Sequence, residues 1–192
     1  MKSNKLYSII LMTFFGMTGS ILIGVIFFKQ SIFFPSRPTF QFIGYGLYGA
    51  LLFSLLEYRS VRDQIYGTVM IFFVNLIIFT GKSISFAYII RDFFLLGGLF
   101  LSIILYYQFL KNYSQSRFYL RSLILVLFYG ILNVLFSSIV FIVNSKTGFP
   151  PFSHIYFHAK FGMLIGFGIA VGIDFYLQNK ESILKLIGSK VA

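Results

Sequence analysis

Six long apolar stretches follow one another along this chain and leave little sequence between them. A stretch of about 17–25 apolar residues can cross the hydrocarbon core of a bilayer as a helix. Because lipid offers the backbone no hydrogen-bond partner, each stretch is expected to satisfy its amide and carbonyl groups within a helix. The sequence therefore predicts an all-α integral membrane protein, one domain in which six transmembrane helices form a bundle. The predicted spans are 7–28, 39–56, 65–80, 92–110, 122–143 and 161–177.

The composition agrees with a membrane protein and excludes several kinds of site. Hydrophobic residues make up 58% of the chain and charged residues 11%, whereas soluble proteins carry about 25% charged residues. The absence of cysteine excludes disulfides, thiolate metal sites and a cysteine nucleophile. The net charge of +11 comes from Lys and Arg in short loops, where membrane topology explains it. We therefore expect no nucleic-acid partner.

The distribution of Lys and Arg indicates how the chain is oriented. The N-terminus, the loops after the second and fourth spans and the C-terminal tail carry ten of the 16 basic residues. Since cytoplasmic segments carry the excess of basic residues, both termini are predicted to be cytoplasmic. We expect a multi-pass protein of the cell membrane, and of a bacterial inner membrane in particular. Its partners are then the lipid bilayer and either another membrane protein or further copies of itself.

The predicted outer loops contain the residues from which a ligand site could be built. We expect loop 144–160, which contains Pro150 and Pro151, to lie on the membrane surface or to fold over the mouth of the bundle. The spacing of His154 and His158 could place both rings on one helical face, as a two-histidine metal site requires. Asp92 is the only outer carboxylate, so no metal site and no cofactor is predicted. The candidate ligand-binding residues are Arg37, Arg91, Asp92, His154 and His158.

Arg91 and Asp92 have two interpretations. Apolar residues flank the pair on both sides, so it is submerged if the fourth helix begins near residue 86. Neighbouring residues on a helix point in different directions, and each side chain would then need a partner from another element. The alternatives are anchoring at a helix end, where an Asp in the first turn is electrostatically favourable, and a ligand or ion-pair site.

Small residues recur at four-residue intervals in the second and sixth spans, and an acid follows each set. This spacing forms a stripe along a helix and lets two helix backbones approach closely. Gly168 and Gly172 add a second small face to the sixth span, which we therefore place at the centre of the bundle. Packing explains the stripes, and a sliding or pore-lining helix is the alternative. The helix-packing residues are Gly46, Ala50 and Ser54 in the second span and Gly162, Gly166 and Ala170 in the sixth.

Four polar residues within or beside the spans are candidate functional groups. Asp174 and Glu57 follow the two stripes, and Asn75 and Asn133 lie inside the third and fifth spans. An acid in a span is costly and faces the bundle interior or water. Asp174 either reaches the interface and pairs with a loop Arg or serves as a coupling or proton-relay carboxylate. The two amides are expected to form interhelical hydrogen bonds or to line a polar cavity.

Familiar catalytic patterns are missing from the sequence. It contains no nucleophile elbow, no paired carboxylates of an aspartyl protease and no glycine-rich phosphate loop before a Lys–Ser or Lys–Thr pair. We therefore do not expect an enzyme.

Two resemblances suggest functions. Segment 49–58, GALLFSLLEY, resembles helices of bacterial membrane-anchor and sensor domains, which often end a small-residue stripe with an acid and then a basic loop. Separately, six spans in 192 residues, with both termini inside and lid-like outer loops, are similar in architecture to the vitamin-binding S components of energy-coupling uptake systems. No binding motif aligns with those S components, so the resemblance implies no site residue.

Two hypotheses of function follow. The first is a non-enzymatic membrane module, an anchor, sensor or assembly subunit that packs against partner helices. The second is a small-solute binding or transport protein with a pocket at the outer face. The module predicts a dry, fully packed bundle, whereas transport predicts a polar cavity that water can reach.

Overall fold

The computed structural model of the chain is helical in most of the residues that it describes. It describes residues 2–28, 37–58, 66–67, 69–70, 73, 86–112, 118–145 and 148–191, with some side chains at the ends of these segments left out. The helices are α1 (Lys2–Phe28), α2 (Arg37–Tyr58), α4 (Phe86–Asn112), α5 (Phe118–Asn144) and α6 (Phe152–Val191).

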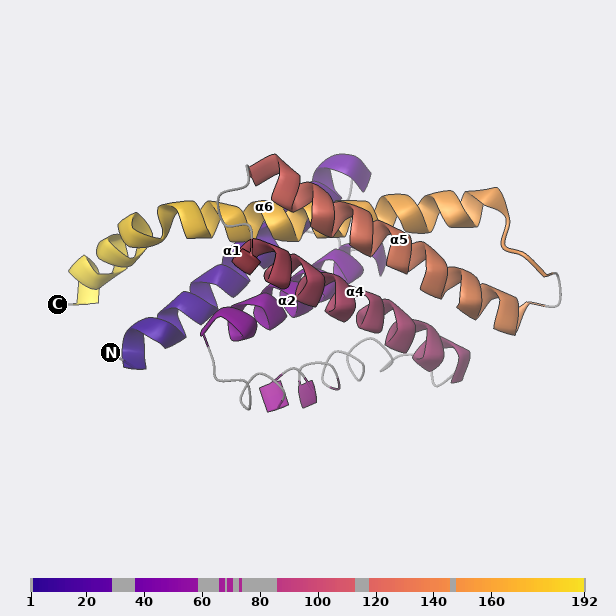
Figure 1. Cartoon of the computed structure of the whole chain (residues 1–192), viewed down its shortest axis with the longest axis horizontal. Helices are drawn as coiled ribbons and strands as arrows, with labels where there is room; N and C mark the ends of the chain where they lie inside the picture. Colours follow the sequence, from indigo (N-terminus) through magenta and orange to yellow (C-terminus); the bar gives the residue numbers. More distant parts are fainter. Residues whose placement is uncertain are drawn as a thin grey trace.

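The longest helix, α6, runs along the whole molecule (Figure 1). It packs against α1 on one side and α5 on another, and α1 and α5 do not contact each other. Helix α2 packs against α1, α4 and α6, and α4 also packs against α5. The start of α1 and the end of α6 lie at the same end of the molecule, whereas α6 begins at the opposite end, beside the end of α5 (Figure 1).

Three of these helices are long and apolar enough to cross a membrane: Lys5–Phe27, Ser122–Val143 and Phe152–Leu186. Helices α2 and α4 contribute the shorter apolar segments Phe42–Glu57 and Phe94–Gln108. The described part of the chain is thus a helical bundle of the kind expected in a membrane. The predicted third span, 65–80, lies largely outside the described residues, although the few that are described there are helical.

The start of α6 differs from the sequence-based expectation. Most of the predicted outer loop 144–160 is helix, because α6 begins at Phe152 rather than at Phe161. The carbonyl oxygen of Pro151 accepts hydrogen bonds from the amides of His154 and Ile155, at 3.0 and 3.3 Å. A proline is well tolerated at a helix start, where its missing N–H leaves no bond unmade. Pro151 therefore caps the start of the helix from the position just before it, where we expected it to be part of a loop.

Helix α4 begins at Phe86, earlier than the predicted span 92–110. Arg91 and Asp92 consequently lie inside the helix, beyond its first turn, and not at its start. Helix α6 also continues past the predicted end of the sixth span at residue 177 and reaches Val191 without a break.

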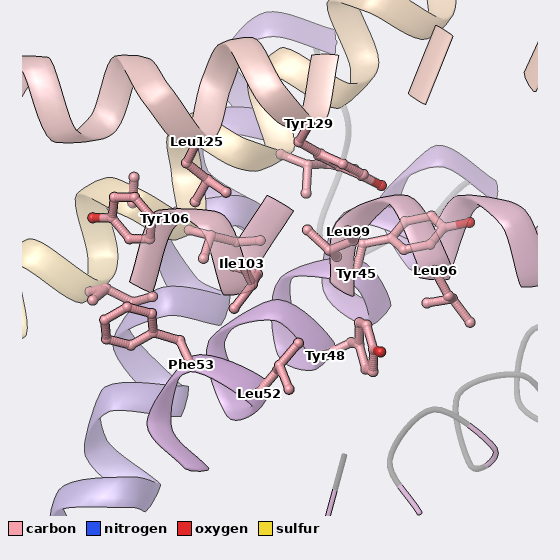
Figure 2. Packing of buried hydrophobic residues seen from close by; sticks show 14 of the residues in the cluster. Tyr45, Tyr48, Leu52, Phe53, Leu96, Leu99, Ile103, Tyr106, Leu125 and Tyr129 are labelled. Atoms are coloured by element: carbon pink, nitrogen blue, oxygen red, sulfur yellow. The ribbon is translucent and has the colours of Figure 1, made fainter. Parts of the chain in front are cut away.

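Large aromatic and aliphatic side chains fill the interior. Figure 2 shows the part of this core between α2, α4 and α5, where rings alternate with leucine and isoleucine side chains. The rings of Phe42 and Phe161 are 5.1 Å apart, and those of Phe53 and Tyr106 are 5.6 Å apart, distances typical of favourable aromatic pairs. The core joins all five helices into one body.

Glycines allow α1 and α6 to approach each other closely. A Cβ atom added to Gly172 would lie 2.1 Å from the carbonyl oxygen of Phe15, and one added to Gly19 would lie 2.2 Å from the carbonyl oxygen of Gly168. Neither position leaves room for any side chain. Gly168 and Gly172 thus bring the backbone of α6 directly against that of α1, in the manner of small-residue crossings in membranes.

The other two sets of small residues lie at different interfaces. On α2, a Cβ added to Gly46 would lie 2.6 Å from Cβ of Ser20, and the Ser54 hydroxyl accepts a 3.3 Å hydrogen bond from Thr13, both partners being on α1. Ala50, on the same face of α2, is fully buried against Gly16. On α6, Gly162 and Gly166 face α5, and Ala170 is fully buried. Helix α6 is therefore held on two of its faces by glycine.

Candidate functional site

A row of polar residues runs along the contact between α5 and α6, near the end of the molecule where these helices meet. We call this row the polar seam; it consists of Tyr129, Asn133 and Ser137 on α5 and of His154 and His158 on α6. The α5 members are spaced four residues apart, so they share one face of that helix. All three are buried, and both histidines are partly buried.

Asn133 connects the two helices. Its side chain is 0% exposed, and its Nδ2 donates a 2.8 Å hydrogen bond to the carbonyl oxygen of His158. Gly162 makes this contact possible, since a Cβ there would lie 2.9 Å from the same Nδ2 atom. Among the residues that the structure describes, the Oδ1 atom of Asn133 has no hydrogen-bond partner.

Tyr129 lies one turn further into the bundle and is fully buried. Tyr45 and Tyr48 of α2 are close enough to interact with it electrostatically. Figure 2 shows the three hydroxyl groups on the same side of the core, with that of Tyr106 on the opposite side. Within the described part of the chain, the Tyr129 hydroxyl has no hydrogen-bond partner. A polar atom left unpaired in lipid is costly, so this position is energetically unusual.

The two histidines occupy the first turns of α6, where Pro151 starts the helix. Their ring centroids are 4.4 Å apart. The ring of His154 also lies 4.9 Å from that of Phe141 on α5, and the ring of His158 lies 5.4 Å from that of Phe157. The Nε2 atom of His154 is buried and has no hydrogen-bond partner in the described residues.

The other predicted ligand-binding residues are located only by their backbones. Arg37 is the first residue of α2, and Arg91 and Asp92 lie in α4, but all three side chains fall outside the described part of the structure. Asn75 lies outside it entirely. Of the five predicted residues, the structure thus brings His154 and His158 together, and Asn133 joins them through the His158 carbonyl oxygen.

The two acids lie away from the polar seam. Asp174 is only 3% exposed on α6, and its Oδ2 accepts a hydrogen bond from the Gln178 side chain one turn later. Glu57 is exposed near the end of α2, close enough to Tyr107 of α4 to interact with it electrostatically. No group of three His, Cys, Asp or Glu side chains comes together among the described residues.

The buried tyrosines are the part of the site that the sequence analysis missed. Tyr129 forms a four-residue series with Asn133 and Ser137, and that spacing within a span was the available signal. Tyr45 and Tyr48 gave a weaker one, because aromatic residues three apart are ordinary core positions on a helix. Phenol, amide and imidazole groups can donate or accept hydrogen bonds, and imidazole can also coordinate a metal ion. The seam is therefore suited to binding a ligand.

Comparisons of this chain with protein-family models, with characterised proteins and with solved structures find no match.

Proposed function

We propose that this chain is a six-span membrane protein with both termini in the cytoplasm. In this proposal it is a non-enzymatic module, an anchor, sensor or assembly subunit that packs against partner helices. The observation that carries the proposal is the contrast between a closed aromatic interior and long apolar faces turned outward on α1 and α5.

The outward face of α5 is the clearest of these surfaces. Five large aliphatic side chains, three or four residues apart, are exposed along it; they are Leu127, Ile131, Leu135, Ile139 and Ile142. A surface of this kind is rare on a soluble monomer. In a bilayer it contacts lipid tails or the helix of another protein without cost, so it supports both the membrane location and a packing role.

The interior supports a module more than a transport path. The largest side chains of the core are fully buried, including five tyrosines. Tyr129 and Asn133 of the seam are themselves 0% exposed. A bundle filled by large side chains is suited to holding a fixed shape against a partner.

The chain path supports an even number of crossings. The start of α1 and the end of α6 lie at one end of the molecule (Figure 1), as two termini on the same side of a membrane require. The excess of Lys and Arg in the termini and in the loops on that side favours the cytoplasm.

Partner packing can be tested with a photo-crosslinking amino acid at Ile131, on the outward face of α5. We expect a discrete protein adduct in intact membranes, identified by mass spectrometry as a second copy or another membrane protein. The matched control is the same amino acid at Ile103, which is fully buried in α4 and should give no intermolecular adduct. Lipid adducts alone at Ile131 and at the other exposed α5 positions would contradict a packing role.

A small-solute binding or transport protein is the second candidate, and the polar seam is the observation that favours it. It is tested by the reactivity of Ser137→Cys, a buried seam position, towards a small membrane-impermeant thiol reagent. Ser54→Cys, buried between α2 and α1, is the control. Reaction at 137 but not at 54 would favour a solute path over the packed module, and protection of both positions would favour the module.

A further inference from the structure

We propose that His154 and His158 form a two-nitrogen binding site for a divalent transition-metal ion, at the end of the polar seam where α6 begins. This site goes beyond the packing role and does not depend on it. Neutral imidazole is a preferred ligand for Zn²⁺, Cu²⁺ and Ni²⁺, whereas Mg²⁺ and Ca²⁺ prefer oxygen.

The geometry supplies two ligands from one rigid element. His154 and His158 are one helical turn apart on α6, and their ring centroids are separated by 4.4 Å. Two rings this close can each place a nitrogen about 2.0–2.1 Å from a shared ion. Because Pro151 begins the helix directly before them, the backbone of both histidines is fixed without the metal.

An unpartnered nitrogen points to a ligand. The Nε2 atom of His154 is buried, and no described residue forms a hydrogen bond with it. A buried nitrogen in this condition is disfavoured, because its water has been lost and not replaced. Coordination of a metal ion would satisfy it. The ring of Phe141 packs 4.9 Å from that of His154 and limits the rotation of the imidazole.

The electrostatics of the helix ends allow a cation here. The start of α6 alone would oppose positive charge, since a helix N-terminus carries a partial positive charge. The last turn of α5, which carries the opposite partial charge, lies beside it, and Phe141 in that turn touches His154. No described carboxylate joins the two histidines. A bound ion would therefore keep its charge and leave coordination positions for water or for a small solute with oxygen or nitrogen donors.

The test uses the full chain, purified in detergent without a polyhistidine tag and titrated with Cu²⁺. We expect one ion to bind per chain, with electron paramagnetic resonance showing coupling to imidazole nitrogens. Binding should weaken in acid, because the ligand is the neutral ring. His154→Gln and His158→Gln should each weaken binding roughly tenfold or more, since losing even an outer contact of a metal ligand costs about 10–100-fold.

Tyr156→Phe is the matched control, because Tyr156 lies between the two histidines in sequence but its exposed side chain points to another face of the helix; this variant should bind Cu²⁺ like the wild type. Three results would overturn the proposal: no saturable binding by the wild type, no nitrogen coupling in its spectrum, or equal affinity in the double His154→Gln/His158→Gln variant. The first two need no variant to fold. Failure here would leave the six-span module standing, because its crosslinking test uses no metal.

Discussion

At the scale of single residues, the absence of a side chain matters most at Gly172. This glycine and Gly168 let α6 rest on the backbone of α1, where a methyl group at Gly172 would lie 2.1 Å from the Phe15 carbonyl oxygen. Backbone atoms cannot rotate aside as a side chain can, so relief would require the two helices to separate. The small-residue spacing in the sequence predicted a face without bulk, but it could not name α1 as the neighbour.

We therefore expect Gly172→Ala to destabilise the protein by about 1–3 kcal/mol, the usual cost of overpacking. The matched control is Gly97→Ala in α4, where an added Cβ meets nothing within 4 Å. That change should be neutral or stabilising by up to about 1 kcal/mol, because alanine favours helix more than glycine does. Reversible unfolding in mixed micelles measures both free energies. Equal effects of the two substitutions would contradict the close α1–α6 crossing.

A second prediction at this scale concerns Tyr129, whose buried hydroxyl has no partner among the described residues. We expect Tyr129→Phe to be neutral or to stabilise the protein by up to about 1–3 kcal/mol, because an unsatisfied buried group is removed. Tyr7→Phe, at an exposed position of α1, is the control and should change nothing. A clear loss of stability in Tyr129→Phe would mean that water or a ligand binds that hydroxyl, and the interior would then not be dry.

At the scale of helices, the sequence predicted most where a helix follows from apolar length alone. The predicted span 122–143 coincides with the apolar segment Ser122–Val143 of α5. The sequence predicted the structure least well at the start of α6, because Pro150 and Pro151 are equally compatible with a loop and with a helix N-terminus. In the structure the carbonyl oxygen of Pro151 accepts hydrogen bonds from two amides of the first turn, which places it at a helix N-terminus.

The residues of the polar seam also differ in how far the sequence alone predicts their arrangement. The spacing of His154 and His158 on one helix can be seen in the sequence, since it needs only one element. The approach of Asn133 to the His158 carbonyl oxygen, and of Tyr45 and Tyr48 to Tyr129, requires knowledge of which helices are neighbours. No local pattern contains that information, because it depends on how five helices share one core.

The outward face of α5 gives a prediction for the element as a whole. Leu135 is 51% exposed there, and in the centre of a bilayer an Arg costs about 2.5–3.5 kcal/mol. We expect Leu135→Arg to reduce membrane insertion sharply, measured as the fraction of protein recovered in carbonate-washed membranes. Leu186→Arg is the control, because Leu186 is 65% exposed and is the last residue of the apolar segment Phe152–Leu186, where an Arg side chain can reach the interface and should be tolerated. Equal tolerance of both changes would argue against α5 facing lipid.

At the scale of the whole molecule, the described helices form one bundle in which α6 packs against α1, α2 and α5, while α4 packs against α2 and α5. Three of the helices have the length and composition of membrane spans, and the start of α1 and the end of α6 lie at the same end of the molecule (Figure 1). The proposed membrane module depends on all six apolar stretches crossing the bilayer in alternate directions. The central claim of the proposal is therefore which side of the membrane each terminus and each loop lies on.

That claim is tested most directly by labelling single cysteines in intact cells, since the chain has no cysteine of its own. Ser153→Cys lies at the exposed start of α6, on the predicted outer side, and Ser114→Cys lies in the predicted inner loop after the fourth span. With a membrane-impermeant maleimide, we predict labelling at 153 in intact cells and at 114 only after permeabilisation. Labelling of both positions from outside would contradict six spans with cytoplasmic termini.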